Sequence, residues 1–357
     1  MYPVSRDSQR SAERKADSMS PVSMSPVARK SADASRLLDV LYAPIQEELA
    51  GVEEILSREL RSKYPFVDEL VRHGFRLGGK RLRPALVLLA GKAAGKITRE
   101  HLVLAAVVEM IHTATLVHDD VLDQASIRRH LDTVNSRWGN EASVLLGDYL
   151  FTHSFYLAST LDSPFACQTI GRATNIVCEG ELRQIASRGQ FGLSEADYLG
   201  IIEAKTAELC ACCCRLGSHY AGATAEVEES LARFGRSLGI AFQIVDDLLD
   251  LQGDEATTGK SLGTDLEQQK PTLPVIRLLD RVDGDQRSQL IAILSRSENH
   301  RRVELEPWLA KSDSLTYTRT QAEAFAARAR DELACLDASP ARDVLASMTE
   351  FVVQRRQ

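Results

Sequence analysis

The stretch that decides the fold is Glu109-Met-Ile-His-Thr-Ala-Thr-Leu-Val-His-Asp-Asp-Val-Leu-Asp123. The residues from Ala105 to Val117 are mostly apolar or small and include neither Gly nor Pro, which predicts a helix. Asp119 and Asp123 are four residues apart, so their carboxylates lie on one face of that helix. Carboxylates so close repel each other unless a cation lies between them, and such oxygen ligands suit Mg²⁺ that also binds a phosphate. A single motif of this kind also fits a solvated acidic helix end.

A second stretch repeats the pattern, because Phe242-Gln-Ile-Val-Asp-Asp-Leu-Leu-Asp250 again ends an apolar segment in acidic residues. Its carboxylates are those of Asp246, Asp247 and Asp250. Two such motifs in one chain are improbable by chance, which favours metal binding over a solvated helix end. Two facing clusters would hold several Mg²⁺ ions around one diphosphate.

Composition limits the class of protein. The chain has 357 residues and a net charge of −7, so it is not expected to bind nucleic acid. No uninterrupted apolar run approaches the roughly 18 residues of a membrane span. The cysteines lack the paired spacing of a zinc site, and we expect small buried side chains in a reducing compartment, the cytoplasm. They are Cys167, Cys178, Cys210, Cys212, Cys213, Cys214 and Cys335.

Two regions differ in kind. Residues 1–33 are rich in Ser, Arg and Pro and are predicted to be a disordered extension. Residues 34–357 are predicted to form one all-α bundle, since no alternating strand pattern of any length occurs. Helical patterns cover Leu37–Leu56, Leu82–Ala94, His101–Val117, Ala142–Leu157, Thr169–Ile185, Ala196–Ala221, Glu228–Leu249, Leu273–Leu279, Ala322–Leu336 and Arg342–Gln354.

Basic residues are spread between the acidic motifs. Gly78-Gly79-Lys80-Arg81-Leu82-Arg83-Pro84 places three cations beside glycines that let a ligand approach, which predicts diphosphate binding. Arg128-Arg129, Lys205-Thr206, Lys260 and Lys270 follow. This arrangement predicts one diphosphate bound through metal and another bound directly by Lys and Arg.

The ordered set of motifs resembles the trans-polyprenyl diphosphate synthases of the long-chain, octaprenyl or solanesyl type. The resemblance runs from about Ala34 to the C-terminus, and it departs from the family at Gln268-Gln269, where a Gly often stands. It implies an isoprenoid-synthase-type helical bundle with a central cavity, usually a homodimer. It also implies a prenyltransferase that condenses isopentenyl diphosphate with an allylic diphosphate.

The resemblance assigns roles by position. Metal binding, by two or three Mg²⁺ ions, falls to Asp119, Asp120, Asp123, Asp246, Asp247 and Asp250. The residues expected to bind isopentenyl diphosphate are Lys80, Arg83, His112 and Arg129. The allylic diphosphate falls to Arg128, Lys205, Thr206, Gln243 and Lys260, and Lys205, Thr206 and Gln243 are the expected catalytic residues.

Product length is predicted from the residues that precede the first motif. Ala114 and Thr115 lie roughly 6 to 7.5 Å below the metal site along a helix. A Phe or Tyr there would block the growing tail, whereas Ala114 does not, so we expect roughly six or more isoprene units for a quinone side chain. A floor deeper down, on Ala142–Leu157, is the alternative. Release of so apolar a product predicts peripheral contact with a membrane.

Other functions fit less of the chain. His118-Asp119 resembles an HD-type phosphohydrolase, which has no use for the second acidic motif. A di-iron bundle needs two Glu-x-x-His pairs, and only Glu109 and His112 form one. A terpene cyclase lacks the isopentenyl diphosphate residues, and a regulatory subunit is expected to have degraded acidic motifs. A short-chain farnesyl or geranylgeranyl diphosphate synthase stays open.

Overall fold

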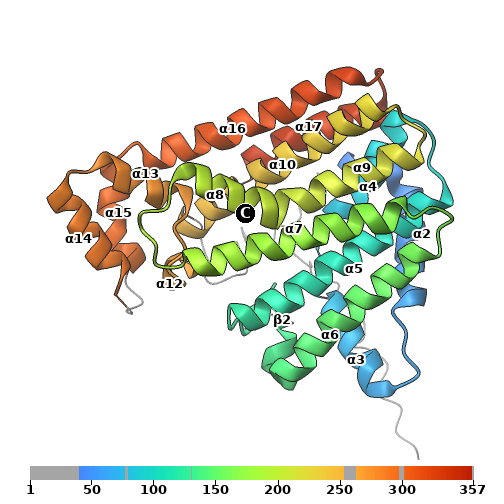
Figure 1. The fold of residues 1–357 in the computed structure, drawn as a ribbon, viewed down its shortest axis with the longest axis horizontal. Helices are drawn as coiled ribbons and strands as arrows, with labels where there is room; N and C mark the ends of the chain where they lie inside the picture. Colours follow the sequence, from blue (N-terminus) through green and yellow to red (C-terminus); the bar gives the residue numbers. More distant parts are fainter. Residues whose placement is uncertain (1–39, 77–78, 130, 253–262, 297–300, 356–357) are drawn as a thin grey trace, which may run out of the picture.

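Helix α5 (Arg99–Leu122) lies inside the bundle and carries the first acidic motif at its C-terminal end. The computed structural model describes residues 40–76, 79–129, 131–252, 263–296 and 301–355. The predicted disordered extension and Lys260 lie outside these residues, so the structure does not test either prediction. Within them the chain is helical apart from connections and one short hairpin, which confirms the all-α prediction (Figure 1).

The helices up to the one that ends in the second motif are α2 (Gln46–Glu59), α3 (Pro65–Arg76), α4 (Leu82–Ala94), α5, α6 (Val134–Ser159), α7 (Phe165–Ser187), α8 (Glu195–Ile202), α9 (Glu208–Tyr220) and α10 (Ala225–Gln252). A 3₁₀ turn, η1 (Ala43–Ile45), precedes α2, and strands β1 (Ile127–Arg128) and β2 (Leu131–Asp132) pair between α5 and α6. After α10 come α12 (Thr264–Glu267), α13 (Leu273–Arg281), α14 (Gly284–Leu294), α15 (Arg301–Lys311), α16 (Ser314–Glu332), η3 (Leu333–Cys335) and α17 (Pro340–Gln354).

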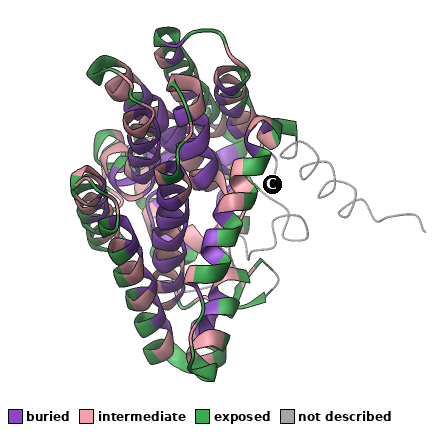
Figure 2. Ribbon diagram, turned by 90° about the vertical axis from the view of Figure 1, so that its right-hand side faces the viewer, coloured by how far each residue is buried: buried purple, intermediate pink, exposed green. Residues whose placement is uncertain are grey.

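The sequence of α5 explains its place. Thr98 caps the helix, and its backbone N–H donates to Nδ1 of the buried His101 at 3.0 Å. Among the described residues, α5 is the only helix long and apolar enough to cross a membrane, but 72% of its most apolar window is buried inside the protein. Such a helix is the core of a bundle, and buried residues concentrate on the central helices (Figure 2).

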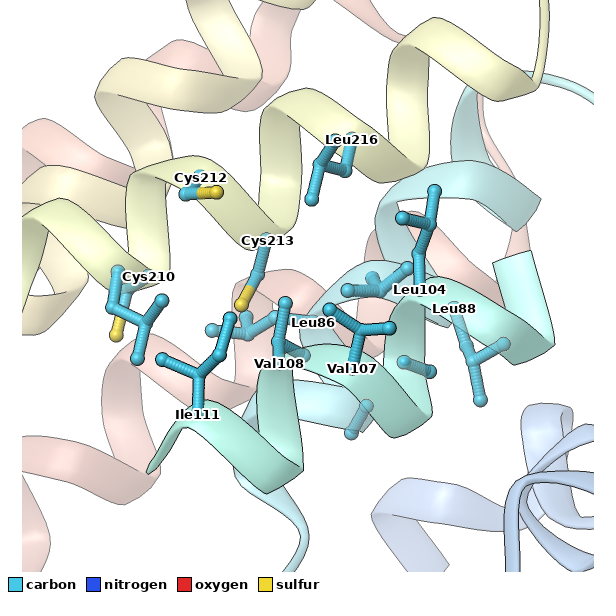
Figure 3. Close-up of a cluster of buried hydrophobic side chains, with 14 of the residues drawn as sticks. Leu86, Leu88, Leu104, Val107, Val108, Ile111, Cys210, Cys212, Cys213 and Leu216 are labelled. Atoms are coloured by element: carbon cyan, nitrogen blue, oxygen red, sulfur yellow. The ribbon is translucent and has the colours of Figure 1, made fainter. Parts of the chain in front are cut away.

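The cysteines of α9 belong to the packed interface with α4 and α5 (Figure 3). Cys210, Cys212, Cys213 and Cys214 are free thiols and all are buried, as expected for small apolar side chains. Gly217 allows this close approach, because a Cβ at that position would lie 2.2 Å from the backbone oxygen of Val87. Among the described residues, no three or more Cys, His, Asp or Glu side chains are gathered closely enough to hold a metal ion by themselves.

Three features differ from the sequence prediction. Helices α3, α14 and α15 were not predicted, because α15 is polar and contains Pro307 and α14 buries only Leu290 and Leu294. The predicted helix over Ala196–Ala221 is divided by a π-helical segment, η2 (Glu203–Ala207). Helix α6 starts eight residues before Ala142 and is kinked at Gly139, whose φ is 85°.

Candidate active site

Both acidic motifs lie at the C-terminal ends of their helices, and each turns one aspartate inward. In the first motif Asp120 is buried, whereas Asp119 and Asp123 are half-buried. In the second motif Asp247 is buried, whereas Asp246 and Asp250 are half-buried. Adjacent helical positions point about 100° apart, so the middle aspartate of each motif faces a different environment from its neighbours.

The inward aspartate of α5 holds an arginine of the hairpin. Arg128 Nε donates to Asp120 Oδ1 at 2.8 Å, and Asp120 is only 1% exposed. Burial raises the pKa of Asp120, and the neighbouring Arg128 lowers it. The first predicted cation of the allylic site is therefore fixed beside the first acidic motif.

The inward aspartate of α10 meets two donors. Tyr198 of α8 donates its hydroxyl to Asp247 Oδ2 at 2.7 Å, and Gln243 Nε2 donates to Asp247 Oδ1 at 2.7 Å. The other end of Gln243, Oε1, accepts a hydrogen bond from the hydroxyl of Thr206 at 2.9 Å. The structure thus brings together the predicted residues Thr206, Gln243 and Asp247, which come from η2 and α10.

A chain of contacts joins the two motifs. Asp123 Oδ1 lies 3.2 Å from Arg188 Nη2 and 3.5 Å from Lys270 Nζ. Lys270 also lies 3.5 Å from Asp265, whose backbone N–H donates to Asp250 Oδ2 at 3.1 Å. The ends of α5 and α10 therefore face each other across this bridge.

Lys205 lies between α7 and the first motif. Its Nζ donates to Gln184 Oε1 at 2.6 Å and forms an ion pair with Glu181. Burial alone would lower the pKa of Lys205, but the carboxylates of Asp119, Glu181 and Asp123 raise it, so Lys205 stays charged. Burial, together with the negative charges of Glu181 and Asp123, raises the pKa of Asp119 to about 6 despite Lys205.

The predicted isopentenyl diphosphate residues form a second, basic cluster: Lys80, Arg83, His112 and Arg129. Burial and the charges of Arg83 and Arg129 hold the pKa of His112 well below its usual value, so the ring is neutral. Gly79 has no side chain to keep the cluster apart, since a Cβ there would lie 2.3 Å from Arg129 Nη2. Burial also lowers the pKa of Arg129 and of Lys80. Cations this close repel each other, which favours binding of an anion.

One cation of the glycine-rich stretch has another use. Arg81 donates to Glu53 at 2.6 Å and to Glu109 at 2.8 Å, and its own φ is 51°. The contact of Arg81 with a diphosphate stays a prediction, because here its guanidinium is paired with two carboxylates of the protein. The buried carboxylate of Glu109 needs a charged partner, and Arg81 supplies it.

The sequence did not point to Arg188, Glu181, Gln184, Tyr198 or Arg355. Arg355 follows α17 and lies 3.7 Å from Asp246 and 4.3 Å from the ring centre of Phe242. Phe351, one turn earlier, lies 5.8 Å below Lys80 Nζ. The end of the described chain therefore meets both the second acidic motif and the basic cluster. A basic pair at the C-terminus, Arg355-Arg356, was the only sequence signal.

The donor set suits a hard divalent cation. The half-buried groups Asp119, Asp123, Asp246 and Asp250 offer only carboxylate oxygens, as Mg²⁺ prefers. The raised pKa of Asp119 shows that its charge lacks full compensation from the protein alone. A bound cation would supply that compensation, so the oxygen donors suit the predicted metal, although no three of the described carboxylates are gathered closely enough to hold it without further ligands.

Comparison with known proteins agrees with this geometry. The sequence profile of the Polyprenyl synthetase family matches residues 64–307. This chain belongs to the polyprenyl synthetase family. It is similar to octaprenyl diphosphate synthase of Escherichia coli, with 36% identity over 87% of this chain and 96% of the relative. It is also similar to an all-trans-nonaprenyl-diphosphate synthase of Rhodobacter capsulatus, with 35% identity over 89% of this chain and 98% of the relative.

Solved structures of polyprenyl synthetase family members share the fold. A decaprenyl diphosphate synthase from Rhodobacter capsulatus superposes with a TM-score of 0.85 at 35% identity, covering 90% of this chain and 99% of that one. A polyprenyl synthase from Caulobacter crescentus, complexed with calcium and isoprenyl diphosphate, gives 0.85 at 34% identity, covering 90% and 98%. The family resemblance and the isoprenoid-synthase fold predicted from the motifs are confirmed.

The raised pKa of Asp119 predicts a cost to stability. A carboxyl group with a pKa of 3.8 unfolded and about 6 folded destabilises the fold by about 3 kcal/mol once ionised, above about pH 6, and not below about pH 4. Asp119→Asn should therefore raise the Tm of the metal-free protein by several degrees at pH 7.5. Thermal unfolding in EDTA measures this, and the gain should vanish near pH 4.

Asp123→Asn is the matched control. It removes the ion pairs with Arg188 and Lys270, so its Tm in EDTA should fall. A Tm for Asp119→Asn at or below that of the wild type at pH 7.5 would contradict the argument.

Proposed function

We propose that the protein is a trans-polyprenyl diphosphate synthase that adds isopentenyl diphosphate repeatedly to an allylic diphosphate and makes a long all-trans product. The observation that carries this is the pairing of two unlike sites: two acidic motifs with Lys205 and Arg128, and a separate basic cluster. One diphosphate binds through metal at the first, and the other binds directly to cations at the second. The names of the relatives, octaprenyl, nonaprenyl and decaprenyl diphosphate synthases, support the long product.

The residues divide the work. Asp119, Asp123, Asp246 and Asp250 would hold two or three Mg²⁺ ions, which when bound neutralise the charge that grows on the departing pyrophosphate. Lys205 and Arg128 hold the same diphosphate by charge-assisted hydrogen bonds. Lys80, Arg83 and Arg129 hold isopentenyl diphosphate, and the neutral His112 adds a hydrogen bond.

Bond making then follows from position. The allylic C–O bond breaks, the electron pair leaves with pyrophosphate, and the double bond of isopentenyl diphosphate attacks the allylic cation. A proton is then lost from the new chain. The released pyrophosphate accepts it, because it has just left the reacting carbon and lies beside it. The apolar helices around the site keep water from the cation.

A product assay tests the proposal. The purified chain alone receives Mg²⁺, labelled isopentenyl diphosphate, and geranyl or farnesyl diphosphate in turn, with an EDTA control. We expect a ladder that ends at one product of roughly six or more isoprene units, and no product in EDTA. A product that stops at three or four units would identify a short-chain synthase. No condensation with either primer would contradict a self-sufficient synthase and favour a subunit of a heteromeric enzyme.

Two residues below the first motif are proposed to set the path of the tail. Ala114 is 1% exposed and belongs to the core, whereas Thr115 is half-buried and its hydroxyl donates to the His112 backbone oxygen at 2.8 Å. Thr115 therefore borders more open space than Ala114 does. A large side chain at either position narrows the route past α5.

Ala114→Phe should shorten the product, and Thr115→Phe should shorten it further because that side chain reaches the more open side. Product sizing by thin-layer chromatography, with the same primer for all variants, measures this. Equal product lengths in wild type and both variants would contradict the proposed path and favour a floor on α6.

A homodimer is proposed through α6 and α7. Leu145 and Tyr156 on α6 are 67% and 63% exposed, and their spacing of about three turns places them on one face. Leu182 on α7 is 66% exposed. The two helices follow one another in sequence and contact each other. An exposed apolar face of this kind favours a second copy of the chain in a two-fold interface.

Leu145→Glu combined with Leu182→Glu should convert the dimer to a monomer. The new carboxylates of both subunits would be buried in the interface without a partner of opposite charge. Light scattering coupled to size-exclusion chromatography gives the mass. Val303→Glu is the matched control, since Val303 on α15 is equally exposed, at 65%, and lies elsewhere. A dimer that withstands both substitutions, or a monomeric wild type, would contradict this interface.

The compartment is proposed from the same features. The free cysteines fit a reducing cytoplasm, and a long apolar product requires transfer from the protein to a membrane surface. The product would then serve as the side chain of a quinone.

A further inference from the structure

A buried line of hydrogen bonds connects three helical segments beside the site. It runs from Tyr198 on α8 to Asp247 on α10, then through Gln243 to Thr206 on η2, with donor–acceptor distances of 2.7, 2.7 and 2.9 Å. Tyr198 is 4% exposed and Asp247 is 5% exposed. The Tyr198–Asp247 contact is therefore closed to water, and the two bonds of Gln243 are partly buried.

Close backbone packing makes the line possible. Gly239, one turn before Gln243, lies so near η2 that a Cβ there would be 2.6 Å from the Cα of Ala207. The π-helical geometry of Glu203–Ala207 places Thr206 opposite Gln243. Such segments often occur at functional positions within helices.

The direction of each hydrogen bond is set by chemistry. Burial and the nearby Asp247 carboxylate hold the pKa of Tyr198 well above 10, so its hydroxyl keeps the proton and donates. Asp247 accepts from Gln243 Nε2 at Oδ1 and from Tyr198 at Oδ2, so the amide nitrogen of Gln243 faces Asp247 and its oxygen faces Thr206. The amide oxygen has no hydrogen, so Thr206 is the donor. The Thr206 proton points at Gln243, and its lone pairs point elsewhere.

We propose that Tyr198 is a positioning residue for the condensation: by fixing Asp247 it orients Gln243 and makes the Thr206 hydroxyl present lone pairs, not its proton, to the electron-poor allylic carbons. The inference rests on the proposed function, in which Thr206 and Gln243 line the reacting carbons. An oriented lone pair stabilises positive charge that develops in the transition state. Without Tyr198 one oxygen of Asp247 is buried and unpaired, and Asp247 and Gln243 are free to reorient.

Tyr198→Phe is compared with Tyr317→Phe. Tyr317 donates to Glu195 Oε2 at 2.8 Å, so it makes the same kind of bond to the same helix, α8, but has no link to Thr206. With both substrates and Mg²⁺ saturating, the single-turnover rate of Tyr198→Phe should fall by about tenfold, less than the loss of a direct catalytic donor. The rate of Tyr317→Phe should stay near that of wild type.

The KM values for both substrates and the half-saturating Mg²⁺ concentration should stay within about twofold of wild type in Tyr198→Phe, since the residue acts on the chemical step. Equal rates in the two phenylalanine variants would overturn the inference. Recovery of the rate by added Mg²⁺ would also overturn it, because Tyr198 would then act through the metal. An inactive wild type would instead refute the proposed function.

A second background separates orientation from simple support of the fold. In Asp247→Asn the new amide can turn either way, because the Tyr198 hydroxyl both donates and accepts, so Gln243 and Thr206 are no longer held in one orientation. Adding Tyr198→Phe should therefore cost little further rate in the Asp247→Asn background, although it lowers the rate alone. A loss of equal size in both backgrounds would overturn the inference.

Discussion

Repulsion between like charges is the constraint on which this structure depends. Six aspartates gather at the ends of α5 and α10, where burial penalises their charged forms. The protein answers with donors and cations: Arg128 for Asp120, Arg188 and Lys270 for Asp123, Arg355 for Asp246, and Tyr198 with Gln243 for Asp247. For Asp119 this compensation is incomplete, because Lys205 lowers its pKa but does not bring it back to the ordinary value.

The basic cluster obeys the same constraint with the opposite sign. Burial, together with the charges of Arg83 and Arg129, keeps the pKa of His112 low, so the ring stays neutral. Burial and the charges of Arg355 and Arg129 also lower the pKa of Lys80, whereas Asp246 raises it. The substrate-free protein thus gathers negative charge in one region and positive charge in the other. A metal-bound diphosphate suits the first region and a metal-free diphosphate suits the second. The favourable binding energy comes from charged side chains that the fold positions before the substrates bind.

Much of this was predictable from the sequence, because motifs are local. The spacing of Asp119 and Asp123, the repeated motif, and the helical pattern of α5 are all contained within short stretches. The contacts of Arg188 with Asp123 and of Arg355 with Asp246 join residues 65 and 109 positions apart, and no local pattern encodes them. The pairing of Arg81 with Glu109 was not predicted for the same reason, since the two residues are 28 positions apart.

The burial of the aspartates explains why each motif contains two adjacent ones. Two adjacent residues of a helix cannot face the same ligand, so only the outer carboxylates of each motif stay half-exposed. The inner ones, Asp120 and Asp247, instead fix a partner that itself belongs to the site: Arg128 in one case, Gln243 in the other. Each motif therefore joins groups suited to a cation with one group that orients its neighbours. In each case a carboxyl oxygen accepts from the partner, Asp120 Oδ1 from Arg128 Nε and Asp247 Oδ1 from Gln243 Nε2, and this contact holds the donor in one direction.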